Sequence, residues 1–174
     1  MVEERSGVVT FQGGPITLVG PEIVVGTALP AGQLTGSDMR PVAIGEAGRG
    51  KTKLVITVPS VDTPVCSIES KKFSDAVRAL DPEKVAVYIV SADLPFAQKR
   101  WSDAEGVDNL TLLSDYRSMD TARNWGLYVK EMGLFARAVY VADPTGKVTY
   151  SEIVPDIASE PDYDAALAAV KSAS

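Results

Sequence analysis

Residues 54–66, LVITVPSVDTPVC, contain the clearest strand-to-helix signal in the chain. Its apolar start predicts a short buried strand that ends at Pro59. Thr63 is a suitable N-cap for a helix, and Pro64 suits the first helical position. Apolar side chains then recur at helical spacing over residues 73–80. The stretch therefore predicts a buried strand that leads into an amphipathic helix.

Strands and helices continue to alternate after this helix. Apolar runs predict strands at residues 85–90, 110–113, 138–141 and 147–154, and helical periodicity predicts helices at 95–104, at 119–125 and from about residue 159 onward. The run at 85–90 is apolar on both faces, as expected of a strand in the middle of a sheet. A strong turn signal at residues 143–146, Asp-Pro-Thr-Gly, joins the last two strands into an antiparallel hairpin.

The N-terminal part of the chain has a different pattern. Residues 8–11 and 16–19 are rich in β-forming side chains and flank a Gly-Gly-Pro turn, which predicts a β-hairpin. Residues 20–53 are rich in Gly and Pro and predict mostly loop with short strands. The whole order predicts an α/β fold in one domain, residues 1–174, with a mostly parallel central sheet, helices on both faces, an N-terminal β-hairpin and a C-terminal antiparallel hairpin. It is compatible with a thioredoxin-like fold, although periodicity alone does not separate this from other α/β folds.

Composition limits the functions that the chain can have. The 174 residues carry 17 basic and 23 acidic side chains, for a net charge of −6, and no Lys/Arg cluster, which argues against nucleic acid or an anionic membrane as a partner. No apolar run approaches the ~18 residues of a membrane-spanning helix. The start of the chain is polar and lacks the basic and apolar regions of a signal peptide, so we expect a cytoplasmic protein.

The chain has one cysteine, Cys66, and no histidine. A structural zinc site and a disulfide within one chain are therefore excluded, and we expect no metal and no cofactor. The lack of histidine also removes the commonest general base. Any redox chemistry must use Cys66 alone or recruit a second molecule.

Cys66 lies where a helix favours an anion. Counted from Pro64, it takes the third helical position, which a capping box normally fills with Glu. The unpaired N–H groups and the helix dipole favour negative charge there. A free thiol has a pKa near ~8.5, and helix N-termini or nearby cations lower such values to ~7 or below. A lone cysteine is more often a buried structural residue, but the capping Thr63 and the strand-end Pro59 favour a reactive thiolate here.

These residues also carry a resemblance. Pro59, Thr63 and Cys66 match the peroxiredoxin motif of Pro, three residues, Thr, two residues and Cys. The full PSVDTPVC resembles the thiol peroxidase branch, and further segments resemble it in the same order: SADLPFAQ at 91–98, LFARAV at 134–139, IVP at 153–155 and EPDYDAAL at 160–167. The resemblance runs from about residue 54 to the end, includes the N-terminal hairpin and is weak over residues 21–53. It implies a thioredoxin-like fold and a thiol-dependent peroxidase.

The resemblance implies a role for each matched residue. Cys66 is the expected nucleophile, and Thr63 is expected to hydrogen-bond the thiolate and the peroxide. Arg137 is expected to hold the thiolate and to polarise the peroxide. Pro59 is expected to shield the site from water. Plainer alternatives exist, since Thr63 could only cap the helix and Pro59 could only end the strand. Arg137 could be a surface residue, but its apolar neighbours place it on or beside a buried strand, where an arginine needs a charged partner.

The sequence departs from the family at one position that bears on the mechanism. Many thiol peroxidases resolve the oxidised cysteine with a second cysteine, in a phrase like Arg-Phe-Cys-Gly-Ala-Glu-Gly, whereas residues 100–106 here read Arg-Trp-Ser-Asp-Ala-Glu-Gly. Ser102 stands at the resolving position and cannot form a disulfide. Trp101 and Asp103 differ as well, which favours a natural one-cysteine sequence over a single engineered replacement. An external thiol, from a small molecule or a thioredoxin-like protein, must then reduce the sulfenic acid.

Three functions remain in competition. The first is a one-cysteine peroxidase that acts on hydrogen peroxide or organic hydroperoxides. Five apolar side chains could form the rim of its site, although their commoner role is packing in the core: Leu94, Phe96, Trp101, Leu134 and Phe135. The second is a peroxide sensor or redox relay that passes oxidation to a partner protein with little turnover. The third is a scaffold with an inert cysteine. The resemblance also predicts a homodimer.

Overall fold

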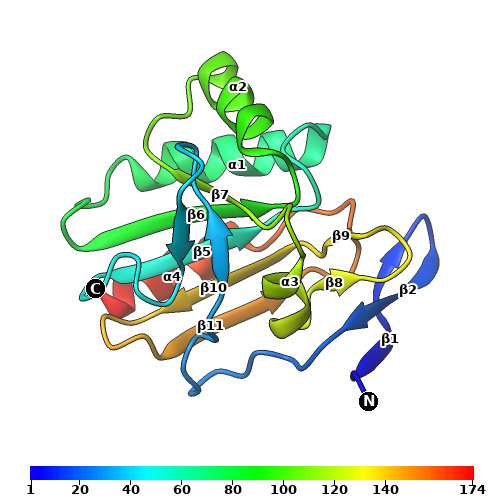
Figure 1. The fold of residues 1–174 in the computed structure, drawn as a ribbon. Helices are drawn as coiled ribbons and strands as arrows, with labels where there is room; N and C mark the ends of the chain where they lie inside the picture. Colours follow the sequence, from blue (N-terminus) through cyan, green and yellow to red (C-terminus); the bar gives the residue numbers. More distant parts are fainter.

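The computed structural model describes residues 1–174, which form two β-sheets and four helices (Figure 1). The larger sheet has seven strands in the order β11-β10-β5-β6-β7-β3-β4. These strands are β3 (Gln33–Thr35), β4 (Pro41–Ala43), β5 (Thr52–Thr57), β6 (Val85–Ser91), β7 (Thr111–Ser114), β10 (Ala138–Ala142) and β11 (Val148–Ile153). The helices are α1 (Pro64–Val77), α2 (Pro95–Glu105), α3 (Asp120–Asn124) and α4 (Tyr163–Ala173). None of them is long and apolar enough to cross a membrane.

The large sheet is mixed, which corrects the prediction of a mostly parallel one. Only the β5–β6 and β6–β7 pairs are parallel. β10 pairs antiparallel with both β5 and β11, and β3 pairs antiparallel with both β4 and β7. The prediction failed because β10 follows a hairpin instead of a crossover helix, and because periodicity says nothing of the direction in which a strand joins its sheet.

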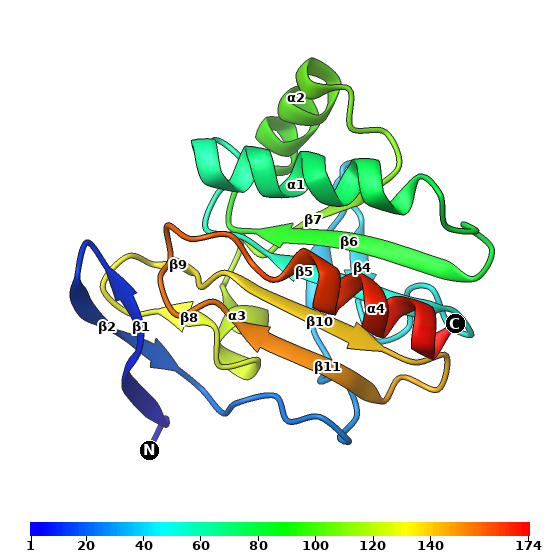
Figure 2. The ribbon, with the colours of Figure 1, turned by 180° about the vertical axis from the view of Figure 1, so that it is seen from behind.

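Alternate side chains of the central strands point to opposite faces of this sheet and form two apolar clusters. On one face, Leu54 and Ile56 of β5 and Val139 of β10 pack against Phe73 of α1 and Val170 of α4. Figure 2 shows α1 and α4 lying across this face. On the other face, Val55 of β5 and Tyr140 of β10 pack toward the α3 segment. Helices therefore cover both faces, as predicted.

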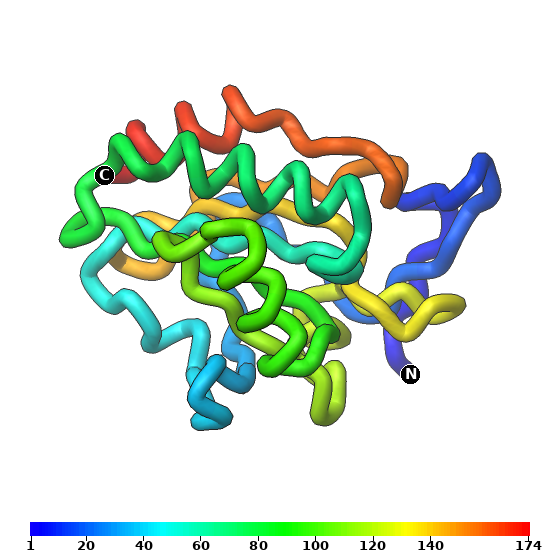
Figure 3. Tube along the Cα trace, turned by 90° about the horizontal axis from the view of Figure 1, so that it is seen from above, coloured from blue at the N-terminus to red at the C-terminus, as the bar shows by residue number.

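The N-terminal hairpin forms as predicted but belongs to a second sheet. Its strands β1 (Glu4–Phe11) and β2 (Gly14–Val19) turn at Gln12 and Gly13, which both have positive φ, as the tight turns of twisted hairpins require. Two short strands that the sequence did not reveal, β8 (Tyr128–Val129) and β9 (Leu134–Phe135), pair onto β2 in the order β1-β2-β8-β9. Seen from above, this sheet lies at one end of the molecule (Figure 3). It places β9 just before Arg137.

The C-terminal helix begins later than predicted. Helical periodicity suggested a start near Ser159, but α4 begins at Tyr163, after Asp162, whose side chain caps the helix by accepting from the amide of Ala165 at 2.9 Å. Pro161 disfavours a helical conformation at the residue before it, which explains the delay. The segment between β11 and α4 consequently forms no helix, and it turns at Ile157 and Ala158 beside Arg137.

Candidate active site

The active-site segment lies where β5 leads into α1. Thr63 is the N-cap of α1, Pro64 is its first residue, and Cys66 takes the third helical position as predicted. The Thr63 hydroxyl oxygen accepts from the Cys66 amide at 3.3 Å, and the hydroxyl donates to the Ser60 carbonyl at 3.2 Å. The first turn is thus fixed by its own cap, with the Cys66 side chain directed inward.

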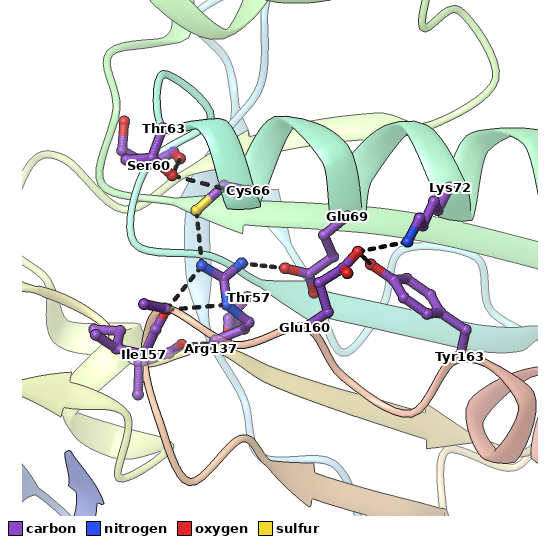
Figure 4. Close-up of polar contacts among 12 residues, drawn as sticks. Thr57, Ser60, Thr63, Cys66, Glu69, Lys72, Arg137, Ile157, Glu160 and Tyr163 are labelled. Atoms are coloured by element: carbon purple, nitrogen blue, oxygen red, sulfur yellow. Dashed lines mark hydrogen bonds and ion pairs between the residues drawn. The ribbon is translucent and has the colours of Figure 1, made fainter. Parts of the chain in front are cut away.

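Cys66 is fully buried and contacts a buried arginine. Its Sγ lies 3.2 Å from Nη2 of Arg137, which is 1 % exposed. Arg137 lies between β9 and β10, and the backbone before it is held by Thr57, whose hydroxyl donates to the Ala136 carbonyl at 2.8 Å. The end of β5, the start of α1 and the start of β10 therefore bring the thiol and the guanidinium together, as Figure 4 shows.

Two further groups hold the guanidinium in its plane (Figure 4). The Ile157 carbonyl accepts from Nε of Arg137 at 3.2 Å and from Nη2 at 2.9 Å. On the other side, Nη1 donates to Oε2 of Glu69, which is fully buried on α1 one turn after Cys66. Arg137 thus has the charged partner that its buried position requires, and one of its Nη2 donors is aimed at the sulfur.

Burial disfavours the ionised form of Glu69 more than the ionised form of Arg137. It raises the pKa of Glu69 to about 7, against the opposing attraction of Arg137, with smaller contributions from the carboxylates of Glu152 and Glu160. Burial lowers the pKa of Arg137, but the attraction of Glu69 and Cys66 outweighs this and leaves it raised. Oε1 of Glu69 has no hydrogen-bond partner, which is consistent with a carboxyl that holds a proton easily. Arg137 therefore keeps its charge, and burial is the reason that the pKa of Glu69 is raised although an arginine lies beside it.

We expect the free energy of unfolding to fall as pH rises from about 4.5 to about 7, and the Glu69→Gln variant to lose most of the slope between about pH 6 and 7, because Asp115, whose pKa burial raises to about 6, contributes at lower pH. The folded protein holds the Glu69 proton up to about pH 7, whereas an unfolded chain releases it near pH ~4.3. Because the folded state binds more protons in this window, its advantage of about 3 kcal/mol is present below the window and is lost as pH rises. Urea unfolding at a series of pH values measures the slope.

Glu160→Gln is the matched control for this experiment. Glu160 is exposed, and a hydrogen bond from Lys72 lowers the pKa of its carboxyl, so it titrates below the window in which Glu69 is expected to act. Because Glu160 adds only a small repulsion to the raised pKa of Glu69, its replacement should keep most of the slope between about pH 6 and 7. A Glu69→Gln variant that keeps the wild-type slope would show that the Glu69 carboxyl is ionised throughout.

A cavity of about 260 Å³ lies next to the active-site segment and is lined by Arg137, whereas the fully buried Cys66 does not line it. Its wall includes Pro59, Thr63 and Arg137, together with apolar side chains from separate parts of the chain: Phe11, Pro64, Val65, Met132, Leu134, Ile157 and Ala158. Among the five residues predicted as an apolar rim, only Leu134 lines this cavity. Phe135 is in the core, Trp101 is largely buried, and Leu94 and Phe96 are exposed on the α2 side. Phe135 and Trp101 thus take the core-packing alternative, and the rim prediction is wrong for Leu94 and Phe96, which are near in the motifs and not near in space.

Comparison with known proteins agrees with this geometry. A family model described as Redoxin matches residues 24–167. The chain belongs to the redoxin family. It is 44 % identical over 165 residues to a thiol peroxidase of Clostridium acetobutylicum, with 95 % of this chain and 98 % of the relative covered. It is 45 % identical to a thiol peroxidase of Staphylococcus aureus, with 94 % and 98 % covered.

A solved structure of a peroxiredoxin-like protein from Aquifex aeolicus is also similar, with a TM-score of 0.89, 39 % identity and 99 % of both chains covered. This likeness confirms the thioredoxin-like α/β fold. The identity with these relatives shows that this redoxin is a peroxiredoxin enzyme of the thiol peroxidase branch, and it has a single cysteine.

The structure brings together the predicted site residues of this redoxin, although their roles stay predictions. Cys66 and Arg137 are in contact, Thr63 caps the turn, and Pro59 is buried at the cavity wall. The Thr63 hydroxyl has one hydrogen to donate, and Ser60 receives it, so a bond from Thr63 to thiolate or peroxide requires the hydroxyl to rotate.

The sequence interpretation missed Glu69 and the Ile157 carbonyl. The sequence did contain an indication of Glu69, because it lies three residues after Cys66 and therefore on the same face of the predicted helix. A backbone carbonyl such as that of Ile157 leaves no signal in the sequence.

Ser102 of this redoxin lies on α2 and faces away from the thiol site. Its hydroxyl donates to the Val107 carbonyl, and its side chain lines a separate cavity with Lys99 and Asp103. No group of three or more Cys, Asp or Glu side chains is placed to hold a metal ion.

Proposed function

We propose that the protein reduces hydrogen peroxide and organic hydroperoxides through attack of the Cys66 thiolate, and that the sulfenic acid is reduced by an external thiol. The observation that carries this proposal is the 3.2 Å contact between Cys66 Sγ and Nη2 of Arg137, a residue that also lines an apolar cavity. We take the whole chain, residues 1–174, as the one domain that performs the reaction.

The first step forms an S–O bond and breaks the O–O bond. The Cys66 thiolate attacks one peroxide oxygen, and the other oxygen leaves with the electron pair of the bond and takes up a proton as water or alcohol. Cys66 becomes a sulfenic acid. Charge moves from sulfur to the leaving oxygen, and a fixed cation with donors aimed at both atoms stabilises that transition state. Arg137 suits this task because Ile157 and Glu69 fix the plane of its donors before the substrate arrives.

Thr63 and Pro59 support this step. Once its hydroxyl turns from Ser60, Thr63 can donate to the peroxide while its oxygen still accepts from the Cys66 amide. Pro59 is rigid and has no backbone N–H group, so its part of the cavity wall offers water no hydrogen-bond donor near the thiolate.

The second step needs a thiol from outside the chain, because Cys66 is the only cysteine. The sulfenic acid and the external thiol condense to a mixed disulfide and water, and a second thiol releases Cys66. Such a cycle needs a reducing compartment, which supports a cytoplasmic location. Because the curated relatives are named thiol peroxidases, repeated turnover is favoured over a sensor or relay.

We also propose a homodimer, as the resemblance implied. Large apolar side chains are left exposed at the start of α1 and of α2, where Ile68 is 48 %, Leu94 50 % and Phe96 65 % exposed. Sedimentation of a monomer at micromolar protein concentrations would contradict the dimer.

Multiple turnover tests the proposed function directly. With excess dithiothreitol, we expect the protein to consume many equivalents of hydrogen peroxide or cumene hydroperoxide, and without thiol to consume one equivalent per Cys66 before the rate falls. Peroxide loss measured against time gives both values. Consumption that stops at one equivalent with every thiol tried would instead support the sensor.

A further inference from the structure

The segment between β11 and α4 holds Arg137 by both its main chain and its side chain. The Val154 amide donates to the Arg137 carbonyl at 2.9 Å, which continues the pairing of β10 with β11. Three residues later, the Ile157 carbonyl accepts from Nε and Nη2 of Arg137, as Figure 4 shows. Nη2 is also the nitrogen that lies 3.2 Å from Cys66 Sγ. The position of the Ile157 carbonyl therefore bears directly on the donor beside the thiol.

The Ile157 carbonyl is the second of two points that fix the guanidinium plane. The first is Glu69, which accepts from Nη1 through one oxygen only, while its other oxygen has no partner. A planar group held at one point can still rotate about it. A displaced Ile157 carbonyl would let Nη2 turn away from the sulfur, and small misplacements of a reacting group cost up to about 10²-fold in rate.

Asp156 shapes the turn that presents this carbonyl. The Ser159 amide donates to the Asp156 carbonyl at 2.9 Å, which closes a β-turn with Ile157 and Ala158 at its centre. Oδ1 of Asp156 accepts from the Ala158 amide at 2.8 Å, the local bond by which Asp side chains favour turns. Ile157 is only 4 % exposed, so the turn directs a buried residue toward Arg137. Asp156 thus sets the direction of the Ile157 carbonyl.

The N-terminal hairpin holds the same turn through Thr10, near the end of β1. The Thr10 amide donates to the Pro155 carbonyl at 2.8 Å, and the Ile157 amide donates to the Thr10 carbonyl at 3.0 Å. These two bonds form a parallel bridge between Thr10 and Asp156. The Thr10 hydroxyl can donate to Oδ2 of Asp156 at 3.1 Å or to the Pro155 carbonyl at 3.3 Å. Figure 3 shows the hairpin meeting the segment after β11 at one end of the molecule.

We propose that Thr10 and Asp156 are positioning residues for the reaction with peroxide, because they hold the Ile157 carbonyl and thereby keep Nη2 of Arg137 aimed at the Cys66 sulfur. The inference rests on the proposed peroxidase function. Neither Thr10 nor Asp156 lines the cavity beside the active-site segment. The N-terminal hairpin, which lies outside the large sheet, is therefore required for the full rate of O–O cleavage.

Replacing Asp156 with alanine should lower the rate constant of the first turnover with hydrogen peroxide about tenfold. The variant loses the bond from the Ala158 amide and the acceptor for the Thr10 hydroxyl. A single turnover without thiol, followed by rapid quenching and mass spectrometry of Cys66, isolates this step from reduction by thiols. Asp156→Asn keeps an oxygen that can accept from the Ala158 amide and should recover most of the lost rate. An asparagine variant as slow as the alanine variant would contradict the role of the turn.

Asp143→Ala is the matched control for the alanine variant. Asp143 is likewise partly buried and caps a turn in the same way, by accepting from the Thr145 and Lys147 amides, but this turn lies at the opposite end of β11. The control should react with peroxide at the wild-type rate. Equal rates for Asp143→Ala and Asp156→Ala would overturn the inference.

A double-variant cycle tests whether Asp156 acts through Arg137. The variant Arg137→Gln with Glu69→Gln has no guanidinium to position, so adding Asp156→Ala to it should change the rate less than about twofold. The same change should cost about tenfold in the wild type. A tenfold loss in both backgrounds would show that Asp156→Ala loosens the site in general, and would refute positioning of the guanidinium.

A second variant covers the case in which Asp156→Ala fails to fold. Thr10→Val keeps the shape of the side chain and the backbone bridge, loses only the hydroxyl, and should slow the first turnover about threefold. Thr17→Val is its control, since Thr17 lies on β2 of the same hairpin, is also partly buried, and contacts Glu131 instead of the turn. Equal rates for these two folded variants would count against the inference. A wild-type protein that forms no sulfenic acid would instead refute the proposed function itself.

Discussion

Replacing Cys66 with serine should abolish peroxide reduction, with a fall in the second-order rate constant of at least about 10⁴-fold. Serine keeps the shape and position of the side chain, but its hydroxyl is not ionised at neutral pH, so no anion is available to attack the O–O bond. Because Cys66 is the only cysteine, no other thiol can take its place. Peroxide loss with excess dithiothreitol measures the effect.

The serine variant should fold normally, since the change is small and the site is not a disulfide. Urea unfolding should therefore show a stability close to that of the wild type, which separates lost chemistry from lost structure. A folded Cys66→Ser protein that still turns over peroxide would place the nucleophile outside Cys66.

Replacing Arg137 with glutamine should lower the rate constant for the reaction with peroxide about 10²- to 10³-fold, the usual effect of losing one preorganised donor at a developing charge. The variant loses the positive charge beside Cys66 Sγ and the donor at 3.2 Å. Stopped-flow measurement of the first turnover isolates this step from reduction by thiols.

Glu69 complicates the Arg137 variant, because removing its partner leaves a buried carboxyl without a cation. The double variant Arg137→Gln with Glu69→Gln removes both charges and keeps a neutral hydrogen-bonded pair, so it serves as the folded reference. It should be as slow as Arg137→Gln. If either folded variant reacted at the wild-type rate, the guanidinium would not be part of the reaction.

Local sequence patterns predicted those parts of the site that depend on short-range structure. The placement of Cys66 at the third helical position followed from Thr63 and Pro64, because a cap and a first-turn proline fix where a helix starts. The buried position of Arg137 followed from its apolar neighbours. These features depend on a few adjacent residues, and the structure confirms each of them.

Long-range features were not predictable in this way. Ile157 reaches Arg137 because the segment between β11 and α4 turns there, and the pairing of β8 and β9 with the N-terminal hairpin rests on residues more than a hundred positions apart. The same limit explains the mixed sheet and the misplaced apolar rim, since periodicity reports the type of an element and not its neighbours. Asp93 was visible as part of a motif, but its bonds to Ser60 and Val61 appear only in three dimensions.

If the buried sulfur beside Arg137 cleaves the O–O bond, one equivalent of cumene hydroperoxide must leave an oxygen atom on it. Intact-protein and peptide mass spectrometry after this treatment should show a gain of one oxygen atom, located on Cys66, that disappears on addition of a small thiol. Recovery of Cys66 as an unmodified thiol would refute the role of this sulfur.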